Sequence, residues 1–205
     1  MLIKTFPEGP LGSNMYTVEF DRYFFIVDPS VDPARAALKD KELKGIFVTH
    51  GHFDHIFCLY KWVSLYPEAP VMIHREDVKL LKDPDLNCSS DMWAPLSFDI
   101  DTEDAASCDG RIIGDTKISV LHTPGHSPGE VCYIFKDTEN VMFTGDMLFR
   151  SSIGRTDLPL GSAFDMKQSL SKISSISEDL KIYPGHGPST TLDTEKKTNP
   201  YLFLT

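Results

Sequence analysis

Short runs of apolar residues alternate with turn-forming residues along most of the chain. Val, Ile, Phe and Tyr dominate these runs, and Gly, Pro, Asp or Ser commonly ends them, a pattern typical of β-strands. We predict strands at residues 13–20, 23–30, 46–50, 71–74, 118–123, 130–136, 141–146 and 181–185.

Helical periodicity is clear between residues 54 and 66, where Ile56, Leu59, Tyr60 and Val63 are spaced for one helix face. We predict further helices at 34–43, 76–81 and 164–176, and a last helix that begins near residue 191 and ends at an Asn-Pro pair. Residues 83–110 carry little pattern, so we predict a loop there that passes over an active site. The alternation of strands and helices indicates a layered α/β architecture.

The length and composition indicate one globular domain that spans residues 1–205. No window approaches 18 consecutive apolar residues, and the first residues lack the apolar stretch of a signal peptide, so we expect neither a membrane span nor a leader. Cysteines occur at 58, 88, 108 and 132, without a C-x-x-C pair. Four reduced thiols in a cytoplasmic protein are the simplest interpretation.

The net charge of the chain indicates which classes of binding partner to expect. Thirty acidic and 20 basic residues leave a net charge of −10, and no run of Lys and Arg forms a basic patch. An acidic surface repels phosphate backbones, so nucleic acid is excluded as an expected partner. A small-molecule substrate is the partner that we expect.

Three of the seven histidines, with an aspartate, lie in the segment VTHGHFDHI at residues 48–56. His50 and His52 are two residues apart at the predicted end of a strand, which would place them on one face. Asp54 and His55 open the next predicted helix, on a neighbouring edge of the same cavity. Divalent metals such as zinc take imidazole and carboxylate ligands. This segment therefore predicts part of two metal shells, and surface-loop residues without a metal are the weaker alternative.

Three further candidate ligands follow predicted strands in turns that contain glycine. They are His126 in LHTPGHSPG, Asp146 in MFTGDMLF and His186 in IYPGHGP. For His74 we favour a polar residue at a strand end, and for His122 a structural role or the orientation of a ligand.

The segments THGHFDHI, HTPGHSPG, FTGDMLF and YPGHGP, which span residues 49–188, resemble the metallo-β-lactamase superfamily. The resemblance implies a four-layer αββα sandwich with a two-metal site at one edge of the sheets. It also implies which residues bind each ion: His50, His52 and His126 for one ion, Asp54, His55 and His186 for the other, and Asp146 as the bridge.

Asp146 indicates which branch of the superfamily the chain resembles, because the β-lactamases of the superfamily typically have cysteine at this position. Aspartate there, together with His55, is similar to the branch that contains glyoxalase II, the lactonases and RNase Z, and the acidic charge disfavours RNase Z. Arg155, in the segment SSIGRTDLPLGSAFDMKQSL, lies where a basic residue of glyoxalase II meets a substrate carboxylate. However, about 19 residues follow His186, so we expect no counterpart of the C-terminal helical domain of glyoxalase II, and Asp157 replaces an expected aromatic residue.

We therefore predict a glyoxalase II-like thioesterase with two divalent cations, of which zinc is favoured and iron or manganese fits the same ligands. Two such cations activate a bridging water as hydroxide, which attacks the thioester carbonyl. Asp54 serves as ligand and helps to hold that water, and Asp28 orients a ligating histidine or only forms an Asp-Pro turn.

Three alternatives remain open. Persulfide dioxygenases share the fold and a GRTD segment like residues 154–157, and they use one iron held by two histidines and one aspartate, equivalent to His50, His126 or their neighbours and Asp146. The second alternative is a lactonase-type ester hydrolase, and the third is a binding module that only contains a structural metal.

Overall fold

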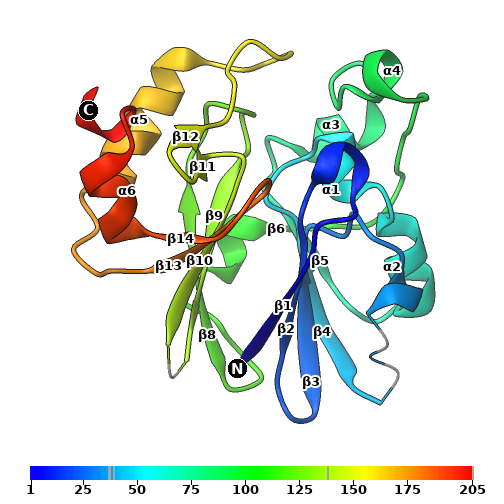
Figure 1. Cartoon of the computed structure of the whole chain (residues 1–205). Coiled ribbons are helices and arrows are strands. Elements are labelled where there is room, and N and C mark those ends of the chain that lie inside the picture. Colours follow the sequence, from blue (N-terminus) through cyan, green and yellow to red (C-terminus); the bar gives the residue numbers. More distant parts are fainter. Residues whose placement is uncertain (37, 39, 138, 205) are drawn as a thin grey trace.

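The computed structural model describes residues 1–36, 38, 40–137 and 139–204, and it contains two six-stranded β-sheets that face each other (Figure 1). The first sheet has the order β1-β2-β3-β4-β5-β6, with bounds Leu2–Phe6, Met15–Glu19, Tyr23–Val27, Glu42–Phe47, Val71–Ile73 and Glu103–Asp104. The second has the order β14-β13-β10-β9-β8-β7, with bounds Thr190–Thr191, Lys181–Pro184, Asn140–Gly145, Val131–Lys136, Thr116–His122 and Ile112–Ile113. A short hairpin pairs β11 (Leu148–Phe149) with β12 (Ser152–Ile153).

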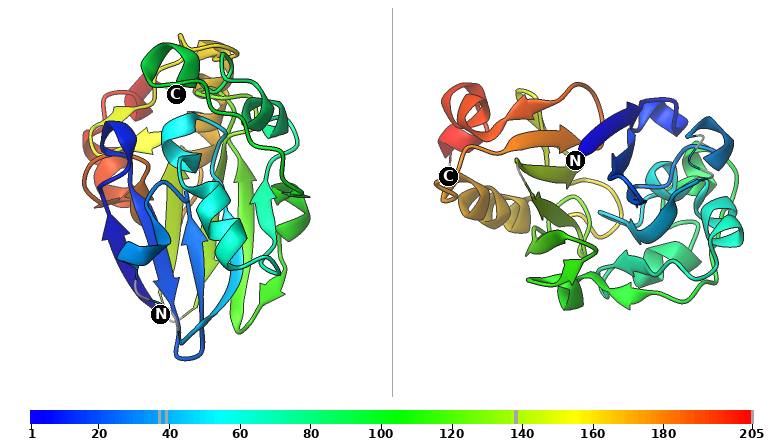
Figure 2. Two further views of the ribbon diagram at one scale, coloured as in Figure 1. Left: turned by 90° about the vertical axis from the view of Figure 1, so that its right-hand side faces the viewer. Right: turned by 90° about the horizontal axis from the view of Figure 1, so that it is seen from below.

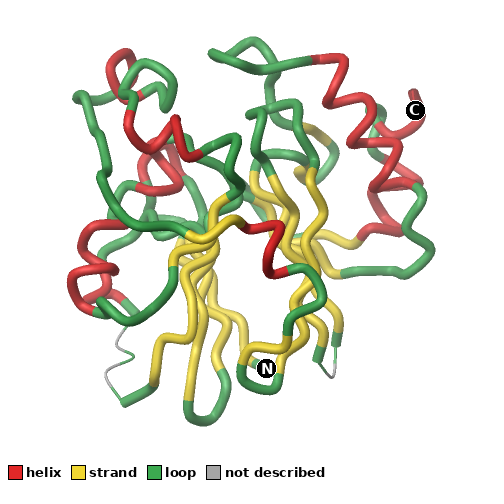
Figure 3. The backbone as a smooth tube through the Cα atoms, turned by 180° about the vertical axis from the view of Figure 1, so that it is seen from behind, coloured by secondary structure: helices red, strands yellow, loops and turns green. Residues whose placement is uncertain are grey.

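Helices cover the outer face of each sheet, as Figure 1 and the view from behind in Figure 3 show. The α-helices are α1 (Phe53–Ile56), α2 (Leu59–Leu65), α3 (Val78–Lys82), α4 (Ser89–Met92), α5 (Ala163–Ser174) and α6 (Leu192–Thr198). Four 3-10 turns are η1 (Pro10–Gly12), η2 (Pro33–Arg35), η3 (Ala105–Cys108) and η4 (Leu202–Leu204). No helix in the described part of the chain is long and apolar enough to cross a membrane.

Three apolar clusters fill the three spaces between the four layers. The first packs α1, α2 and α3 against the first sheet, and Trp62 is its largest buried side chain. The second lies between the sheets, where Phe47 meets the rings of Tyr133 and Phe135 edge-on at 5.1 and 5.2 Å. The third packs α5 and α6 against the second sheet through residues such as Leu170. This arrangement confirms the predicted αββα sandwich, and the end-on view in Figure 2 shows the layers.

Strand direction brings several strand ends to one edge of the sandwich. β3, β4, β5 and β6 are parallel to one another. In the second sheet β10 is parallel to β13, and β8 and β10 are both antiparallel to β9, so β8, β10 and β13 run in one direction. Parallel strands end at the same edge of a sheet. The segments that directly follow β4, β8, β10 and β13, helix α1 included, contain all the predicted metal ligands, which explains why distant motifs meet.

The predicted helix at 34–43 is wrong. Asp32 caps only the short turn η2, and from Glu42 onward the chain is strand β4, paired with β3. Residues 37 and 39 of the predicted helix lie outside the described residues. Pairing with a buried neighbouring strand outweighs helix propensity, which amounts to less than about 1 kcal/mol per residue.

Three other boundaries differ from the prediction. The helix predicted at 54–66 is divided into α1 and α2, because the Cys58 amide donates to the carbonyl of Pro29 at 2.9 Å. The segment 83–110 contains α4, β6 and η3 in addition to loop. Strand β1 was not predicted, because its sequence LIKTF mixes polar and apolar residues at an exposed sheet edge.

Candidate metal centre

The structure brings the seven predicted ligand residues into one cluster at the shared edge of the two sheets. Three groups within it have their candidate ligand atoms within 4.8 Å of one another: His50, His52 and His126; His50, His55 and Asp146; and Asp54, His55 and His186. We call the first the three-histidine group and the last the mixed group. The three-histidine group and the mixed group each offer the ligands for one ion, and the remaining group shares a residue with each of them, so the two ions would be neighbours.

The convergence of His50 and His52 has a cause other than the predicted one. Strand β4 ends at Phe47, so both histidines follow the strand and alternation along it does not align them. The loop nevertheless brings their ring centroids to 4.8 Å, and His52 becomes the residue that precedes α1. Asp54 and His55 open α1 as predicted. Loop geometry, which the alternating pattern does not encode, therefore sets this part of the site.

His126, Asp146 and His186 come from the second sheet. His126 lies in the turn between β8 and β9, Asp146 directly follows β10, and His186 lies two residues beyond β13. Gly185 permits this approach, because a Cβ there would lie 2.2 Å from Oδ1 of Asp146 and 2.6 Å from Cε1 of His55. Any larger residue at position 185 would displace these two side chains.

Asp146 lies between the two groups. Its Oδ1 is 3.3 Å from Nε2 of His55, and its Oδ2 is 3.5 Å from Nε2 of His126 and 3.6 Å from Nε2 of His186. Oδ2 of Asp54 is 3.1 Å from Nε2 of His186. A carboxylate placed between two groups of imidazoles has the position that a bridging ligand requires.

Several polar atoms of this cluster have no hydrogen-bond partner among the described residues. They are buried, and they are Nε2 of His50, Nε2 of His52, Nε2 of His55 and Oδ1 of Asp146. Buried polar atoms are nearly always paired, because losing water without a new partner costs about 1–3 kcal/mol. The other ring nitrogen of His52, Nδ1, is hydrogen-bonded to Nε2 of His126 at 2.8 Å, so Nε2 is the unpaired nitrogen of His52. The unpaired nitrogens and the carboxylates are donors suited to divalent cations, so the residues fit a metal centre.

The protonation of the cluster supports the same fit. Burial, assisted by the other imidazoles, lowers the pKa of His50 well below its ordinary range and that of His52 to about 3. Burial favours a higher pKa for Asp146, but His55 and His126 outweigh it and keep the pKa low. Burial likewise opposes a charge on His55, yet Asp54 and Asp146 raise its pKa well above the usual value. Neutral imidazoles and ionised carboxylates are the forms that bind metals, so His50, His52 and Asp146 are in the form that binds a cation, whereas His55 must first lose a proton.

Asp28 holds two of the candidate histidines in place. Nδ1 of His55 lies 2.9 Å from Oδ2 of Asp28. The same oxygen accepts the Thr49 hydroxyl at 2.8 Å, and that hydroxyl is 3.1 Å from Nδ1 of His50. The predicted hydrogen bond between Asp28 and a ligand candidate is thus present, and it fixes which ring nitrogen faces the site.

Two acidic residues beside the cluster were missed in the sequence. Glu130 is fully buried, accepts the Asp146 amide at 2.6 Å and lies 3.8 Å from Nδ1 of His50. Burial and then Asp146 raise its pKa well above the ordinary value. Asp77, also fully buried, accepts three hydrogen bonds from the loops around His52 and His126. Glu130 could have been found in the sequence, because it is an acidic residue at the start of an otherwise apolar strand. Asp77 could not, because an aspartate at the start of a short helix is common and indicates no special role.

His74 and His122 lie outside the cluster. Their rings stack on each other with centroids 4.0 Å apart, and Nε2 of His122 is 2.9 Å from the carbonyl oxygen of Pro128. Neither belongs to a candidate metal group among the described residues. His74 directly follows β5 and His122 is the last residue of β8, so His74 lies at a strand end as expected, and the position of His122 agrees with a structural role.

A cavity of about 260 Å³ opens onto the cluster. His52, Asp54, His126, Asp146 and His186 form its polar floor. Its walls are largely apolar, from Leu11 of η1, Met92 of α4, Phe149 of β11 and Leu158. Cys88 and Met92 belong to the segment 83–110, so that segment borders the candidate site as predicted.

Arg155 lines the same cavity, but its side chain is already paired. Its Nε and one terminal nitrogen donate to the two carboxylate oxygens of Asp157 at 2.6 and 2.7 Å. The backbone carbonyl of Arg155 lies 2.8 Å from Nδ1 of His126. The residue therefore orients a candidate ligand through its main chain, a contact that the side-chain argument did not predict.

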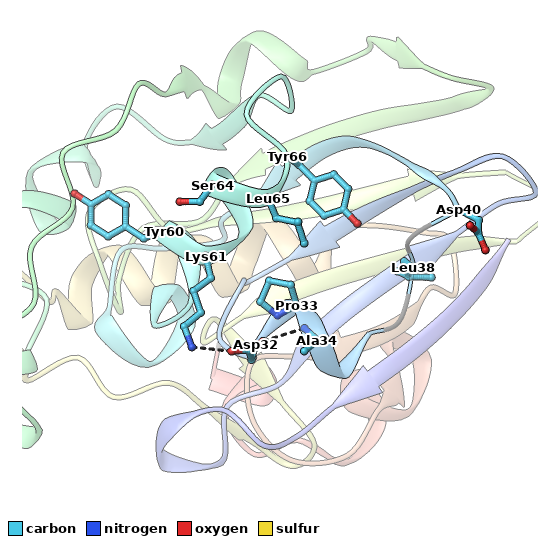
Figure 4. A pocket seen from close by; sticks show the side chains of 10 residues that line it. All are labelled: Asp32, Pro33, Ala34, Leu38, Asp40, Tyr60, Lys61, Ser64, Leu65 and Tyr66. Carbon is cyan, nitrogen blue, oxygen red and sulfur yellow. Dashed lines mark hydrogen bonds and ion pairs between the residues drawn. The ribbon is translucent and has the colours of Figure 1, made fainter.

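A larger cavity, of about 910 Å³, lies beside α2 away from the cluster (Figure 4). Tyr60, Leu65 and Tyr66 border it, and Lys61 pairs with Asp32 at 2.7 Å. Among the described residues no histidine lines it, and none of its lining residues belongs to a candidate metal group. Size therefore does not identify the site, whereas the chemistry of the lining does.

Comparison with known proteins agrees with this geometry. The model of the metallo-beta-lactamase superfamily matches residues 9–186. The probable metallo-hydrolase YqgX of Bacillus subtilis is 35% identical to this chain, and the alignment covers 96% of this chain and 95% of the relative. Hydroxyacylglutathione hydrolase GloC of Haemophilus influenzae is 31% identical, with 86% of each chain covered.

Two solved structures are similar over almost the whole chain. BLEG-1 B3 metallo-beta-lactamase is 35% identical with a TM-score of 0.88, covering 98% of this chain and 99% of the other. TTHA1623, solved in a di-iron-bound form, is 32% identical with a TM-score of 0.78, covering 97% and 99%.

Proposed function

This chain belongs to the metallo-β-lactamase superfamily, and we propose that it is a dinuclear metal-dependent hydrolase whose substrate is a thioester. The observation that carries the proposal is the complete set of seven ligand candidates, arranged as two groups with Asp146 between them. A protein with a purely structural metal would need only one closed group of ligands. Here the cluster opens onto a cavity, as catalysis requires.

In this proposal His50, His52 and His126 hold one cation, Asp54, His55 and His186 hold the other, and Asp146 is shared. When bound, a pair of divalent cations lowers the pKa of a shared water and polarises a carbonyl oxygen. Zinc is the cation that we favour. Iron and manganese suit the same ligands, and the di-iron form of TTHA1623 supports iron as a candidate.

The residues of this chain prepare the site for that chemistry. Asp28 orients His55, and the Arg155 carbonyl orients His126, so that each ring presents its free nitrogen to the cluster. Asp54 faces the cavity, where its carboxylate is placed to accept a hydrogen bond from the attacking water. No serine or cysteine nucleophile is required, which agrees with the absence of a nucleophile–base pair among the candidate residues.

The cavity walls support an acyl compound as substrate. Leu11, Met92, Phe149 and Leu158 form an apolar rim that contacts an acyl chain and limits access of water. The name of GloC supports a glutathione thioester, and thiolates leave readily because thiols are more acidic than alcohols. We assign Arg155 a secondary role in binding a substrate carboxylate, because Asp157 already occupies one edge of its guanidinium.

The setting of the proposed reaction is cytoplasmic, with no nucleic acid as partner. All four cysteines are buried and free, which agrees with a reducing compartment. The net charge of −10 gives no support for contact with nucleic acid.

Metal content followed by hydrolysis of S-lactoylglutathione tests the proposal. Two metals per chain with turnover are the expected result. Two metals without turnover would contradict the glutathione thioester and direct the assay to other thioesters, to lactones and to a β-lactam. One iron per chain, with oxygen consumed on glutathione persulfide, would overturn the proposal in favour of a persulfide dioxygenase, whose GRTD segment this chain shares at 154–157.

A further inference from the structure

A buried carboxylate outside the metal cluster joins two of the loops that carry candidate ligands. Asp77 directly precedes α3 and has no exposed surface. We infer that Asp77 is a positioning residue, which clamps the loop of His50 and His52 to the loop of His126 and thereby sets the geometry of the three-histidine group. It does not touch the metal, and it acts through backbone and hydroxyl groups.

The hydrogen bonds of Asp77 are divided between the two loops. Its Oδ2 accepts the amide of Gly51 at 2.9 Å and the hydroxyl of Ser127 at 2.6 Å. Its Oδ1 accepts the amide of Gly129 at 2.6 Å. Gly51 lies between His50 and His52, and Ser127 is the neighbour of His126. One rigid group therefore holds each loop within one residue of a candidate ligand.

The contact with the second loop is too close for any residue but glycine at position 129. A Cβ at Gly129 would lie 2.7 Å from both the amide nitrogen and Oδ1 of Asp77. Such a separation is well inside van der Waals contact, so a side chain there would push the loop away. The position of the Asp77 carboxylate therefore requires glycine at position 129, which explains the glycine of the sequence PGE at 128–130.

The consequence for the metal centre follows from the spacing of the rings. Nδ1 of His52 and Nε2 of His126 face each other at 2.8 Å. Because Nδ1 of His126 donates to the Arg155 carbonyl, Nε2 of His126 is an acceptor, and it accepts a hydrogen bond from Nδ1 of His52. The two rings belong to the two loops that Asp77 connects, so a shift of either loop changes the separation of these nitrogens. None of the hydrogen bonds of Asp77 reaches the loop of His186, and His55 is held by Asp28 instead. We therefore expect a disturbance of Asp77 to act on one ion and not on the other.

The test is Asp77→Asn, which keeps the shape of the side chain. An asparagine has one acceptor oxygen, so at least one of the three donors loses its partner. Metal-free protein is titrated with Zn²⁺ in competition with a chelator, and the two binding constants are compared with those of the parent. We expect one constant to weaken by about 10- to 100-fold, the usual range for residues that orient ligands, and the other to stay unchanged.

Two controls identify the affected ion. Exposed Asp101→Asn is the matched control and should leave both constants unchanged. His52→Ala removes a ligand of the three-histidine group, and adding Asp77→Asn to it should not weaken the remaining ion further. Equal loss at both ions, or no loss at either in a folded Asp77→Asn protein, would overturn the inference.

A milder variant keeps the test decisive if Asp77→Asn does not fold. Ser127→Ala removes one of the three hydrogen bonds, and we expect a several-fold weakening of the same ion. A folded Ser127→Ala protein with both constants unchanged would again overturn the inference. The inference rests on the two-cation part of the proposed function. Absence of metal binding in the parent defeats that function, whereas two bound ions and an insensitive Asp77→Asn defeat only the inference.

Discussion

The two halves of the metal centre differ in how they are held. In the three-histidine group, His50, His52 and His126 are all almost completely buried, and hydrogen bonds at the back of the group fix two of the rings. In the mixed group, the His186 side chain is 27% exposed. The three-histidine group is therefore enclosed by protein, whereas the mixed group has one imidazole that reaches solvent at the cavity.

The two halves also differ in charge. Burial keeps His50 and His52 neutral by lowering the pKa of each. The mixed group contains the Asp54 carboxylate and His55, whose pKa is raised by Asp54 and Asp146. A cation that enters the three-histidine group therefore displaces no proton from His50 or His52, whereas one that enters the mixed group must displace the proton of His55.

Removing the residue shared by both halves should have the largest effect. We expect Asp146→Ala to reduce thioester hydrolysis by at least on the order of 10³-fold, more than the loss of a typical single oxyanion donor. The cause is that both groups lose a carboxylate and the charge that it contributes. Elemental analysis should show fewer than two metals per chain. Exposed Asp21→Ala, in the turn between β2 and β3, is the control. Activity near the parent level in the Asp146→Ala protein would remove the dinuclear mechanism.

Variants that remove orienting hydrogen bonds should lower the metal affinity of the two halves to different extents. Asp28→Asn weakens the direct acceptor for His55, so we expect about a 10- to 100-fold loss of affinity in the mixed group. Because Asp28 reaches His50 only through Thr49, we expect a smaller loss in the three-histidine group. Thr49→Val removes the hydroxyl beside His50 and is expected to weaken the three-histidine group instead. Chelator competition on both variants provides the measurement. The same response in both proteins would mean that the halves are not supported independently.

The dependence of metal binding on pH should follow the difference in charge. At neutral pH His55 holds a proton in the metal-free protein because its folded-state pKa is raised. Affinity of the mixed group should therefore fall about tenfold for each unit that the pH is lowered below that raised pKa. His52, with its pKa of about 3, adds no such slope between pH 4 and pH 7. Calorimetry in buffers of different ionisation enthalpy measures the released protons, and release of none at the mixed group would contradict the assignment.

The smallest effect is expected at the rim. Arg155→Ala leaves the carbonyl that contacts His126 in place, and the guanidinium that it removes is exposed and already paired with Asp157. We expect a KM for S-lactoylglutathione that rises a few-fold with kcat nearly unchanged, consistent with the ~0–1 kcal/mol of an exposed ion pair. Steady-state kinetics distinguish the two constants. A large fall in kcat would show that the side chain acts in the chemical step.

Most of the fold follows from local patterns that the sequence displays. The apolar runs at 141–146 and 181–185 mark the strands that end at Gly145 and Pro184. Asp146 directly follows the first strand and His186 lies two residues beyond the second, so both candidate ligands lie near the predicted strand ends. The exceptions are informative. The segment 34–43 contains good helix formers, but its last two residues, Glu42 and Leu43, pair with strand β3 and are not helical.

The candidate chemical groups and the strand that precedes each of them could be identified from the sequence alone. Residue type and local periodicity are properties of neighbouring positions, so they are visible in one dimension. Which groups support the site depends on the tertiary structure. The Asp77 carboxylate, the Glu130 carboxylate and the Arg155 carbonyl form hydrogen bonds with residues far away in the chain. Such contacts depend on how two sheets face each other across a packed core, and the order of residues along a strand does not encode that relation.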